Sequence, residues 1–576
     1  MIPSLPRRQE PTDLGVAVVT GGARGIGQGV AQEMVRRGYY TVVIDNGTSL
    51  DGMGSDDSSL AEAEAALTGS GQRGEVVTCD VRDPQATRGA ISDVMRRHGS
   101  VEVLVNMAGI LRPGAFLEDT AETWDLVLST HVAGHVNLIN AVLPAMLYRK
   151  RGVIVNCTST AALLGSMRQP AYSAAKEAII GLTRYLASRL ASDGITVNAV
   201  SPSAYTRMGT PSAEQPSAPE PEAVKRNPGL ARREPSDVGR FAGWLTEPQC
   251  AELTGRIFHV AGKYVIEYEH LRAWKWAAVA PPGGVYEVEE SLRWVIGRPH
   301  PTVIGPWPAH DFRLQDIERL WEGTSAGPDL AAGARRKSAE AASDAPVAVI
   351  GDYADGALDL IAKDVGPLIR DGDRPAGVRP YEVSSLPPDA GARPARGAIV
   401  FRGKTTPREY PSHDVAASLL PDPSIACGKL ASMLSDVQSA IRAAHGHVNG
   451  SVVVVLAGDT PWNSDRPDAL NWLTWYGTIG LIRGVAATES IYGVRVNGLI
   501  AGSANDGLIG PALCYLLSSG SSWLNGYLLA VAEDGVGLMA DERPRWQSYS
   551  DGPGFALPDF LRQEIRAISA EIVEPG

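Results

Sequence analysis

Short apolar runs alternate with longer amphipathic stretches from about Leu14 to Gly262. In the longer stretches, such as IGQGVAQEMVRRG and ATRGAISDVMRRHG, apolar residues recur at the spacing of one helix face. The short runs are rich in valine and isoleucine, which is typical of strands buried on both faces: VAVVTG, YTVVID, GEVVTCD, VEVLVNMAG, GVIVNCTS, ITVNAVSP and GRIFHVAG. The alternation predicts a doubly wound α/β domain over residues 14–262, with helices on both faces of a parallel sheet.

A second alternation of this kind follows in the C-terminal half of the chain. Its predicted strands are VAVIGD, GAIVFRG, SVVVVLAG, VRVNGLIAG and GYLLAVAEDG. When the halves are aligned so that Arg184 falls on Arg483, Asn198 falls on Asn497 within a shared helix-and-strand pattern. This internal alignment predicts a second, Rossmann-like sheet domain of related topology over residues 347–540.

Other segments interrupt or join the two predicted domains. Residues 1–13 form an N-terminal arm, 263–323 an extension, 324–346 a low-complexity linker and 541–576 a tail. The extension contains five tryptophans, which we expect to pack against the first domain or a partner subunit: Trp274, Trp276, Trp294, Trp307 and Trp321. Residues 203–235 are rich in proline, serine, alanine and glutamate, and a loop of this length is typical of a lid or a disordered insertion.

The composition is that of an ordinary globular protein that is too long for a single core. Of the 576 residues, 44% are hydrophobic and 20% are charged. The net charge of −12 argues against nucleic acid or an anionic membrane as the main partner. We expect a cytoplasmic protein, because no apolar run is long enough to span a membrane, the first residues lack a secretory signal, and the five cysteines are scattered without metal-site spacing.

The first motif with chemical content is VVTGGARGIG, which follows a predicted strand and opens a predicted helix. Gly21, Gly25 and Gly27 would let backbone N–H groups and the helix N-terminus approach a pyrophosphate. This strand–turn–helix context favours a dinucleotide site over an ordinary tight turn, with Arg24 and Ile26 among the contacts.

Asp45 ends the second predicted strand, in VVIDNG. A carboxylate there can accept hydrogen bonds from the ribose hydroxyls of adenosine and would repel a 2′-phosphate, so we expect NAD rather than NADP. The alternative is a surface aspartate that begins a turn before Asn46. Arg24 could contact a phosphate of either cofactor, which leaves the choice between NAD and NADP open at this point.

Tyr172 and Lys176 share one face of a predicted helix. A free tyrosine has a pKa of about 10, and a neighbouring ammonium together with an oxidised nicotinamide would lower it. Tyr172 could then exchange a proton with an alcohol while hydride passes to or from the cofactor. Ser159, in NCTS, could hydrogen-bond the substrate oxygen where negative charge develops.

Together, these motifs resemble the short-chain dehydrogenases/reductases over roughly residues 14–262. The resemblance implies that Tyr172 and Lys176 also contact the cofactor, with Lys176 on the nicotinamide ribose. It implies further cofactor contacts at Asp80 and Val81 in CDV, at Asn106, Ala108 and Gly109 in NMAG, and at Pro202 and Thr206 in SPSAYT. Two positions depart from the family pattern, because Met107 replaces the usual asparagine and Ser203 the usual glycine.

His131 stands where many members of this family carry an asparagine that supports the active-site helix and a water of the proton relay. With AYTRM and the ending TGRIFHVAGKYVIEYEH, it resembles the (3R)-hydroxyacyl-CoA dehydrogenase part of the type 2 peroxisomal multifunctional enzymes and its bacterial relatives. His131 is therefore a candidate catalytic residue that would relay protons or fill the structural role of the asparagine, and the sequence leaves both open. His135, His259 and His270 are interpreted as packing or surface residues.

The second predicted domain does not repeat this chemistry. Its counterparts are Asn471 for Tyr172, Trp475 for Lys176 and Ala457-Gly458 for Ser159. Asp352 and Asp355 would put negative charge where a pyrophosphate would lie. We therefore expect a catalytically silent domain that packs on the first as a second subunit would, giving an intramolecular pseudo-dimer; a homodimer of the whole chain is also open.

These observations predict an NAD(P)-dependent oxidoreductase, a ketoreductase or alcohol dehydrogenase without a metal, whose only active site lies in residues 14–262. The subgroup resemblance suggests a bulky secondary alcohol or ketone of the acyl-thioester, steroid or polyketide kind. The composition suits a GC-rich bacterium and its secondary metabolism. The alternatives are a non-redox enzyme on the same scaffold (a dehydratase, epimerase or cyclase) and a non-catalytic scaffold protein, against which the intact Ser159, Tyr172 and Lys176 argue.

Overall fold

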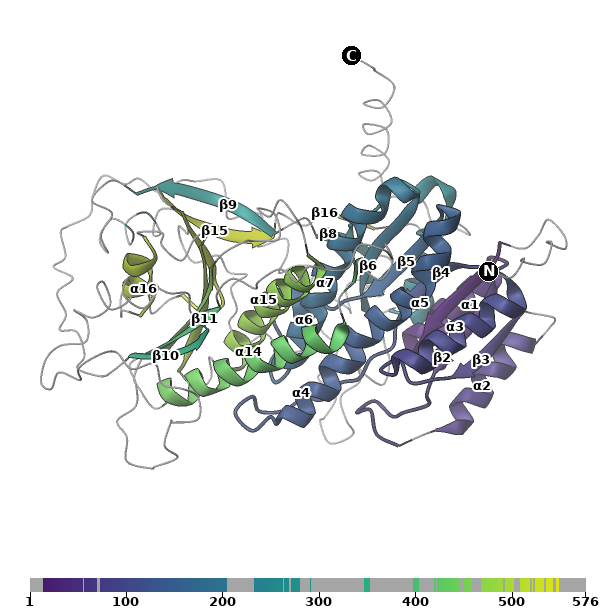
Figure 1. Ribbon diagram of the computed structural model, residues 1–576, viewed down its shortest axis with the longest axis horizontal. Helices are drawn as coiled ribbons and strands as arrows, with labels where there is room; N and C mark the ends of the chain where they lie inside the picture. The colour runs from purple at the N-terminus through teal and green to yellow at the C-terminus, as the bar shows by residue number, and fades with distance from the viewer. Residues whose placement is uncertain are drawn as a thin grey trace, which may run out of the picture.

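The computed structural model describes both predicted domains, the first almost completely and the second in its main helices and strands (Figure 1). The described residues are 14–54, 56–69, 73–204, 233–262, 264–268, 271–279, 288, 291, 347–352, 397–402, 419–420, 422–445, 450–457, 468–489, 493–501, 508–517, 521, 524–532, 535–541 and 545–548. Thr206, His270, Asp355 and Gly458 lie outside them, as do the arm, the linker, most of the loop 203–235, and Trp294, Trp307 and Trp321.

The first sheet contains all seven strands predicted for the N-terminal half. They are β1 (Val16–Thr20), β2 (Tyr40–Asp45), β3 (Gly74–Thr78), β4 (Val101–Asn106), β5 (Gly152–Cys157), β6 (Ile195–Ser203) and β7 (Ile257–Ala261). These strands run parallel in the order β3-β2-β1-β4-β5-β6-β7. The order reverses between β1 and β4, which is the place where doubly wound sheets bind their ligands.

Helices cover both faces of this sheet, because alternate strand residues point to opposite sides. Ala17 and Val19 pack on the side of α1 (Gly25–Arg36), α2 (Asp57–Thr68) and α9 (Pro235–Trp244). Val16 and Val18 pack on the side of α3 (Pro84–His98), α4 (Ala121–Leu128), α5 (Gly134–Arg149) and α7 (Pro170–Leu190). The predicted doubly wound α/β class of the N-terminal half is therefore confirmed.

The helical run 121–149, made by α4, a π-helical turn and α5, is long and apolar enough to span a membrane. Of its most apolar part, 78% is buried inside the protein. The run is accordingly a core helix here, and it is the only one among the described residues with that length and composition.

The second sheet contains the five strands predicted for the C-terminal half. They are β10 (Val347–Asp352), β11 (Gly397–Arg402), β12 (Ser451–Ala457), β13 (Arg495–Ala501) and β14 (Leu528–Ala532), in that order and all parallel. Val452 and Val454 pack on the side of α14 (Pro423–Ala444) and α15 (Ala469–Glu489). Val453 and Val455 pack on the side of α16 (Ile509–Leu517), so this sheet too is covered on both faces.

Asn198 and Asn497, which the internal alignment superimposes, make the same two hydrogen bonds in their own halves. Asn198 donates to the Leu253 carbonyl at 2.7 Å and accepts from the Arg256 N–H at 3.0 Å. Asn497 donates to the Leu524 carbonyl at 3.1 Å and accepts from the Tyr527 N–H at 3.0 Å. Each asparagine thus ties the strand on which it lies, β6 or β13, to the turn that leads into the next strand.

The two halves exchange their end strands. In the first half, β8 (Tyr264–Tyr268) runs antiparallel to β7, and β9 (Leu271–Ala278) follows almost at once but pairs with the second sheet at β15 (Gly535–Asp541). In the second half, β15 runs antiparallel to β14, and β16 (Arg545–Ser548) then pairs with the first sheet at β8. Each sheet is therefore completed by a strand from the other half of the chain.

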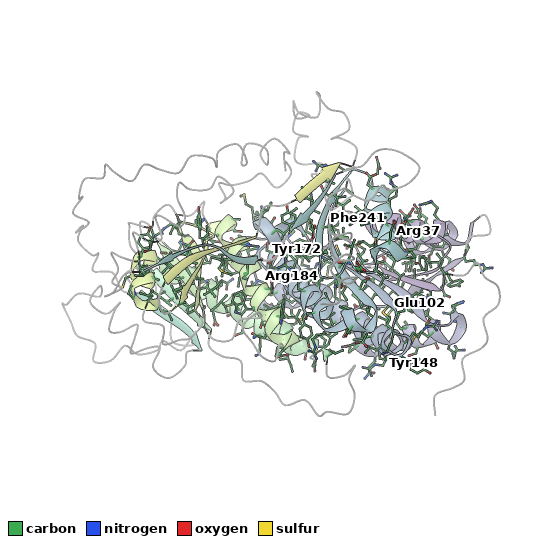
Figure 2. The ribbon with its side chains drawn as sticks, turned by 90° about the horizontal axis from the view of Figure 1, so that it is seen from above. Arg37, Glu102, Tyr148, Tyr172, Arg184 and Phe241 are labelled. Atoms are coloured by element: carbon green, nitrogen blue, oxygen red, sulfur yellow. The ribbon has the colours of Figure 1, made fainter. Side chains whose placement is uncertain are left out.

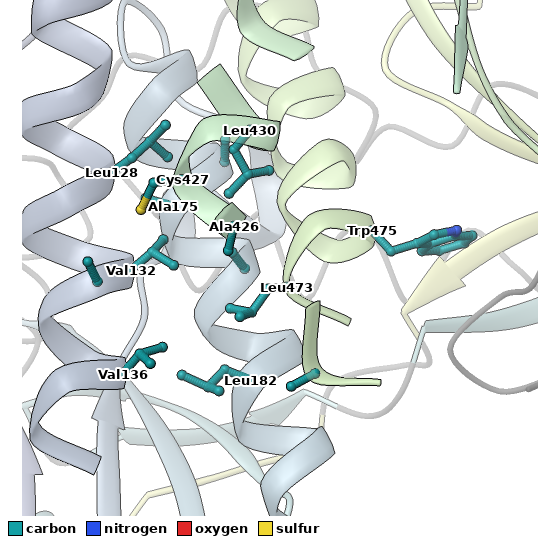
Figure 3. Packing of buried hydrophobic residues seen from close by; sticks show 14 of the residues in the cluster. Leu128, Val132, Val136, Ala175, Leu182, Ala426, Cys427, Leu430, Leu473 and Trp475 are labelled. Atoms are coloured by element: carbon teal, nitrogen blue, oxygen red, sulfur yellow. The ribbon is translucent and has the colours of Figure 1, made fainter. Parts of the chain in front are cut away.

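One apolar core joins the halves along α7 and α15, which lie side by side in the middle of the molecule (Figure 1). Figure 3 shows Leu128 and Val132 of the first half beside Cys427 and Ala426 of α14, and Val136 beside Leu182 of α7. The same core extends to Val452 and Val454 in the second sheet. This continuity means that separating the halves would expose a large apolar surface to water.

Candidate active site

The glycine turn between β1 and α1 is held in a form that only glycine accommodates. Gly21 has a φ of +63°, and a Cβ there would lie 2.7 Å from Ala108 Cα. A Cβ on Gly27 would lie 2.1 Å from the Gly21 carbonyl oxygen. The turn leads directly into α1 at Gly25, and the first turn of this helix carries no acidic residue. The helix N-terminus and the bare backbone fit the pyrophosphate of a dinucleotide.

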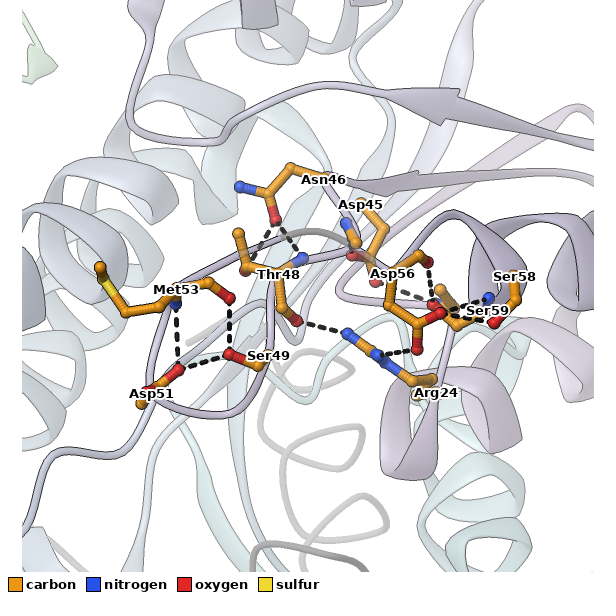
Figure 4. Close-up of polar contacts among 12 residues, drawn as sticks. Arg24, Asp45, Asn46, Thr48, Ser49, Asp51, Met53, Asp56, Ser58 and Ser59 are labelled. Carbon is orange, nitrogen blue, oxygen red and sulfur yellow. Dashed lines mark hydrogen bonds and ion pairs between the residues drawn. The ribbon is translucent and has the colours of Figure 1, made fainter.

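Asp45 lies beside this turn at the end of β2. Its Oδ2 accepts a hydrogen bond from the Ala23 N–H at 3.1 Å, and its Oδ1 accepts one from the Gly47 N–H at 2.9 Å. Arg24 turns toward the loop after β2, where it pairs with Asp56 at 2.9 Å and donates to the Thr48 carbonyl (Figure 4). The positive charge of Arg24 is thus already compensated by a carboxylate.

The ends of β1 and β4 are joined by Thr20, a residue that the sequence interpretation did not single out. Its Oγ1 accepts hydrogen bonds from the backbone N–H groups of Met107 and Ala108, both at 3.0 Å. Asn106 donates to the side chain of Asn156 at 3.1 Å, which links β4 to β5. The NMAG segment therefore lies directly over the switch point of the sheet.

Two further predicted cofactor residues follow β3. Asp80 pairs with Arg82 at 2.6 Å, and the Val81 carbonyl accepts a hydrogen bond from Asn137 of α5 at 2.9 Å. Pro202 lies near the end of β6, where the neighbouring Ser203 side chain accepts a hydrogen bond from Arg233 at 3.1 Å. Arg233 belongs to none of the motifs recognised in the sequence, and it lies at the far end of the long loop 203–235.

The three predicted catalytic residues lie together at the carboxyl end of β5. Ser159 caps α6 (Thr160–Leu164) by accepting from the Ala161 N–H at 3.2 Å. Lys176 on α7 donates from Nζ to the Cys157 carbonyl at 2.8 Å. That Nζ is 5.6 Å from the centre of the Tyr172 ring, and the Ser159 hydroxyl is near enough to the Tyr172 phenol to act on its pKa. A hydroxyl, a phenol and an ammonium therefore converge at the edge where NMAG also lies.

Burial has the largest effect on the pKa values of the phenol and the ammonium at this site. It raises the pKa of Tyr172 above its ordinary value of 10.0, with the Cys157 thiol adding to the rise and the Ser159 hydroxyl opposing it. It also lowers the pKa of Lys176, against the opposing effect of Cys157. The lowering expected from Lys176 together with an oxidised nicotinamide is not found in the protein by itself, because desolvation of the phenolate raises the pKa of Tyr172.

His131 lies in a π-helical turn, η2 (Ser129–Ala133), directly behind Tyr172. Its ring meets the Tyr172 ring edge-on, with the ring centres 5.2 Å apart. Its Nε2 lies 3.2 Å from the Ile110 nitrogen and 2.9 Å from the Ile110 carbonyl oxygen. Burial and the charge of Lys176 hold the pKa of His131 well below 6.5, so the ring is neutral.

These contacts favour a structural role for His131, because it links the segment after NMAG to the helix behind Tyr172. A Cβ on Gly109 would lie 2.5 Å from His131 Cε1, so the ring packs directly against the NMAG backbone. His135, one turn along the helix, is buried and accepts a hydrogen bond from the Cys157 N–H at 3.4 Å. His259 is also buried and pairs with Ser201 at 3.1 Å, which agrees with a packing role for both.

The aligned positions of the second half have a different character. Trp475, the counterpart of Lys176, is buried and points from α15 toward the strands of the second sheet (Figure 3). Asn471, the counterpart of Tyr172, is half-buried on the same helix. Neither an indole nor an amide can act as the acid–base pair described above, because neither ionises near neutral pH.

The N-terminal half of the chain is similar to known short chain dehydrogenases. The family model described as short chain dehydrogenase matches residues 15–217. The oxidoreductase UcpA of Escherichia coli (strain K12) is 33% identical over 246 residues, which cover 42% of this chain and 90% of that protein. The 3-oxoacyl-[acyl-carrier-protein] reductase FabG of Staphylococcus epidermidis is 32% identical over 246 residues, covering 43% of this chain and 97% of that protein. A crystal structure of a short chain dehydrogenase from Mycobacterium avium is 29% identical, covers 45% of this chain and 86% of that one, and superposes with a TM-score of 0.37.

Proposed function

The chain belongs to the short-chain dehydrogenase family, and on that premise we propose that its N-terminal half is an NAD-dependent oxidoreductase that interconverts a secondary alcohol and a ketone. The observation that carries the proposal is the convergence of Ser159, Tyr172 and Lys176 beside the NMAG segment. The glycine turn, two strands away, supplies the cradle for the dinucleotide.

Each side chain has a distinct task in this chemistry. A bound nicotinamide supplies or accepts the hydride. Tyr172 gives its phenolic proton to the carbonyl oxygen of a ketone, or takes the proton of an alcohol in the reverse direction. Ser159 donates a hydrogen bond to the same oxygen, and the ammonium of Lys176 stabilises the phenolate that remains after proton donation. Burial raises the pKa of the phenol, so Tyr172 carries its proton at neutral pH and can donate it when a ketone binds.

The contacts around the glycine turn support NAD as the cofactor. Asp45 places a carboxylate where a dinucleotide seated on this turn would carry its adenosine ribose, and a 2′-phosphate would be repelled there. Arg24, the one cation noted in the turn, is paired with Asp56 and with the Thr48 carbonyl. Binding of NADP would require Arg24 to leave its carboxylate partner.

The substrate we propose is a ketone on a bulky acyl chain, held as a thioester or as a polyketide-like intermediate. The FabG relative, whose name describes a 3-oxoacyl-[acyl-carrier-protein] reductase, supports the thioester class. The resemblance of His131 and its surroundings to the (3R)-hydroxyacyl-CoA dehydrogenases points to the same chemistry. A cytoplasmic location and a place in bacterial secondary metabolism stay predictions.

We further propose that the C-terminal half packs on the N-terminal half in the way that a second subunit would. The contacts between α7 and α15 are reciprocal under the internal alignment of the halves. A Cβ on Gly181 would lie 2.9 Å from the Tyr476 side chain, and a Cβ on Gly480 would lie 2.5 Å from that of Glu177. Ala178 faces its own counterpart, because its Cβ would lie 3.3 Å from a Cβ on Gly477. Reciprocal contacts of this kind are what a two-fold axis produces.

The polar contacts across this interface are reciprocal in position and different in chemistry. Arg483 pairs with Glu177 at 3.6 Å. Arg184 donates a hydrogen bond to the Tyr476 hydroxyl at 3.1 Å and lies over its ring. Arg184 lies on α7, the helix that also carries Tyr172, in the middle of the molecule where the halves meet (Figure 2). Glu177 and Tyr476 are counterparts under the internal alignment, and each of them contacts the arginine of the other half.

The proposed function is tested by measuring cofactor and substrate together. The full chain is mixed with NADH and either acetoacetyl-CoA, as a small 3-oxoacyl thioester, or a bicyclic ketone, and both reactants are quantified over time. We expect one NADH to be oxidised for each ketone reduced, and a slower reaction with NADPH. Consumption of substrate with the cofactor unchanged would instead establish a non-redox enzyme on this scaffold.

A further inference from the structure

Two loops of the N-terminal half border the carboxyl edge of the sheet where the catalytic residues lie. The first, 111–120, follows NMAG and leads into α4; the second, 165–169, lies between Ser159 and Tyr172. They are joined by a hydrogen bond from the Gly114 N–H to the Arg168 carbonyl at 2.9 Å. Substrates of doubly wound sheets bind outside the carboxyl ends of the strands, so these loops border the position of the ketone.

The C-terminal half holds the second loop through α15. The Arg168 N–H donates to the Thr488 hydroxyl oxygen at 3.0 Å, and on α6, just before the loop, the Ala162 carbonyl accepts a hydrogen bond from Arg483 at 3.3 Å. A Cβ on Gly165 would lie 2.4 Å from the Arg483 carbonyl oxygen. Arg168 has a φ of +59°, a left-handed conformation that is costly for a residue with a side chain. The Thr488 bond is therefore made to a backbone group that the loop holds under strain.

The C-terminal half holds the first loop through α14. Gln438 donates from its side-chain amide to the Phe116 carbonyl at 2.6 Å and to the Asp119 carbonyl at 3.0 Å. The Gln438 side chain is buried, so both donated bonds replace bonds to water. Phe116 is fully buried and contacts the Trp124 ring on α4. One amide thus fixes both ends of the segment 116–119.

We propose that Gln438 and Thr488 are positioning residues for the active site of the other half, through which the half without the tyrosine–lysine pair sets the geometry of substrate binding. The inference rests on the proposed function for the identity of the substrate. The contacts fall on the substrate side of the site, whereas the glycine turn and Asp45 belong to β1 and β2, farther from α15 (Figure 1). Loss of either contact therefore weakens substrate binding and leaves NADH binding intact.

The test compares Thr488→Val with Thr478→Val in the full chain. Both threonines are buried on α15, and each hydroxyl donates to the carbonyl four residues earlier at 2.8 Å. Thr488 additionally accepts from Arg168, so the difference between the variants isolates the contact between the halves. Gln438→Leu removes the second contact without introducing a charge.

Steady-state kinetics and cofactor titration provide the first readout. We expect the KM for the ketone to rise about fivefold in Thr488→Val and in Gln438→Leu, the usual effect of losing one hydrogen bond. The Kd for NADH should change less than about twofold, and Thr478→Val should match the unmodified chain. Equal KM values in the two threonine variants would overturn the proposal, since only a structural role would remain.

Hydrogen exchange provides a readout that does not depend on turnover. The Arg168 amide should exchange faster in Thr488→Val than in Thr478→Val, because it loses the Thr488 hydroxyl as its acceptor. The Gly114 amide should also exchange faster, because it donates to the carbonyl of Arg168. Unchanged exchange would overturn the positioning role even if the chain reduces ketones. If the chain oxidises no NADH while the exchange still differs, the proposed reaction fails and the contact between the halves stands.

Discussion

The ammonium of Lys176 donates a hydrogen bond to the carbonyl oxygen of Cys157, 2.8 Å away, at the end of the strand that precedes Ser159. This bond anchors the cation at the end of β5, at the same sheet edge as Tyr172. Burial lowers its pKa from 10.5, so the cation is easier to neutralise than a surface lysine.

We predict that ketone reduction weakens as the pH rises through the lowered pKa of Lys176. The reaction needs the phenolic proton of Tyr172 and the charge of Lys176, and the lysine loses its proton first because its pKa is lowered from 10.5 while that of Tyr172 is raised above 10.0. A pH profile of kcat/KM should therefore decline below pH 10.5. Lys176→Met should lower kcat at least about a hundredfold and abolish this decline, whereas the exposed Lys150→Met should do neither.

Replacing Asp45 should change the cofactor preference. Asp45→Asn removes the negative charge beside the expected ribose, and we predict that the ratio of NADP to NAD affinity rises about tenfold or more. Titration of both cofactors measures this ratio. Asp51→Asn, an exposed carboxylate in the following loop, is the matched control and should leave the ratio unchanged. An unaltered preference in the Asp45 variant would remove the argument for NAD.

Buried histidines should make the protein sensitive to acid. Burial, with Lys176 nearby, lowers the pKa of His135 to about 3, and burial with Arg233 nearby lowers that of His259 to about 4. The unfolded chain takes up these protons near the ordinary histidine pKa of about 6.5. The stabilisation is thus fully present above that value and is lost as the pH falls toward the folded values.

Urea unfolding at about pH 7 and about pH 5 measures this loss. Each histidine should contribute on the order of 2 kcal/mol to the decrease in unfolding free energy between these two values. His259→Gln should reduce the pH dependence by that amount. A decrease that is the same with and without His259 would contradict its assigned burial in the neutral form.

The close approach of α7 and α15 should make Gly480 intolerant of a side chain. A Cβ there would lie 2.4 Å from the Ser173 carbonyl oxygen, so we predict that Gly480→Ala lowers the unfolding free energy by about 1–3 kcal/mol. Gly428→Ala on α14 is the control, because a Cβ there meets nothing within 4 Å; it should be neutral or stabilising by up to about 1 kcal/mol. Both variants should unfold in one transition, since the core and the end strands are shared. Two separate transitions would show that the halves are independent.

Local sequence pattern was enough to predict a large part of the fold. Alternating apolar runs located the strands from β1 to β7 and from β10 to β14, because burial on both faces leaves few polar positions. The spacing of Tyr172 and Lys176 placed them on one helix face, and Asn198 and Asn497, which the internal alignment superimposes, make the same two hydrogen bonds.

What the sequence did not predict depends on contacts between distant segments. Nothing in LRAWKWAA indicates that β9 pairs with the other sheet, since an edge strand accepts any strand of suitable length. Gln438 and Thr488 are ordinary helix residues until the fold places them against loops of the other half. The raised pKa of Tyr172 likewise follows from burial, which the pattern Tyr-x-x-x-Lys does not encode.

The central claim is that Tyr172 in the N-terminal half performs the proton transfer of a redox reaction. Single-turnover mixing of the full chain with NADH and ketone tests it directly, with Tyr172→Phe compared with Tyr148→Phe, a tyrosine 80% exposed on α5 and distant from the site (Figure 2). We predict that both variants bind NADH, that Tyr148→Phe oxidises it at the normal rate, and that Tyr172→Phe is slower by a factor of about 10² to 10⁴. Undiminished oxidation in Tyr172→Phe would contradict the account.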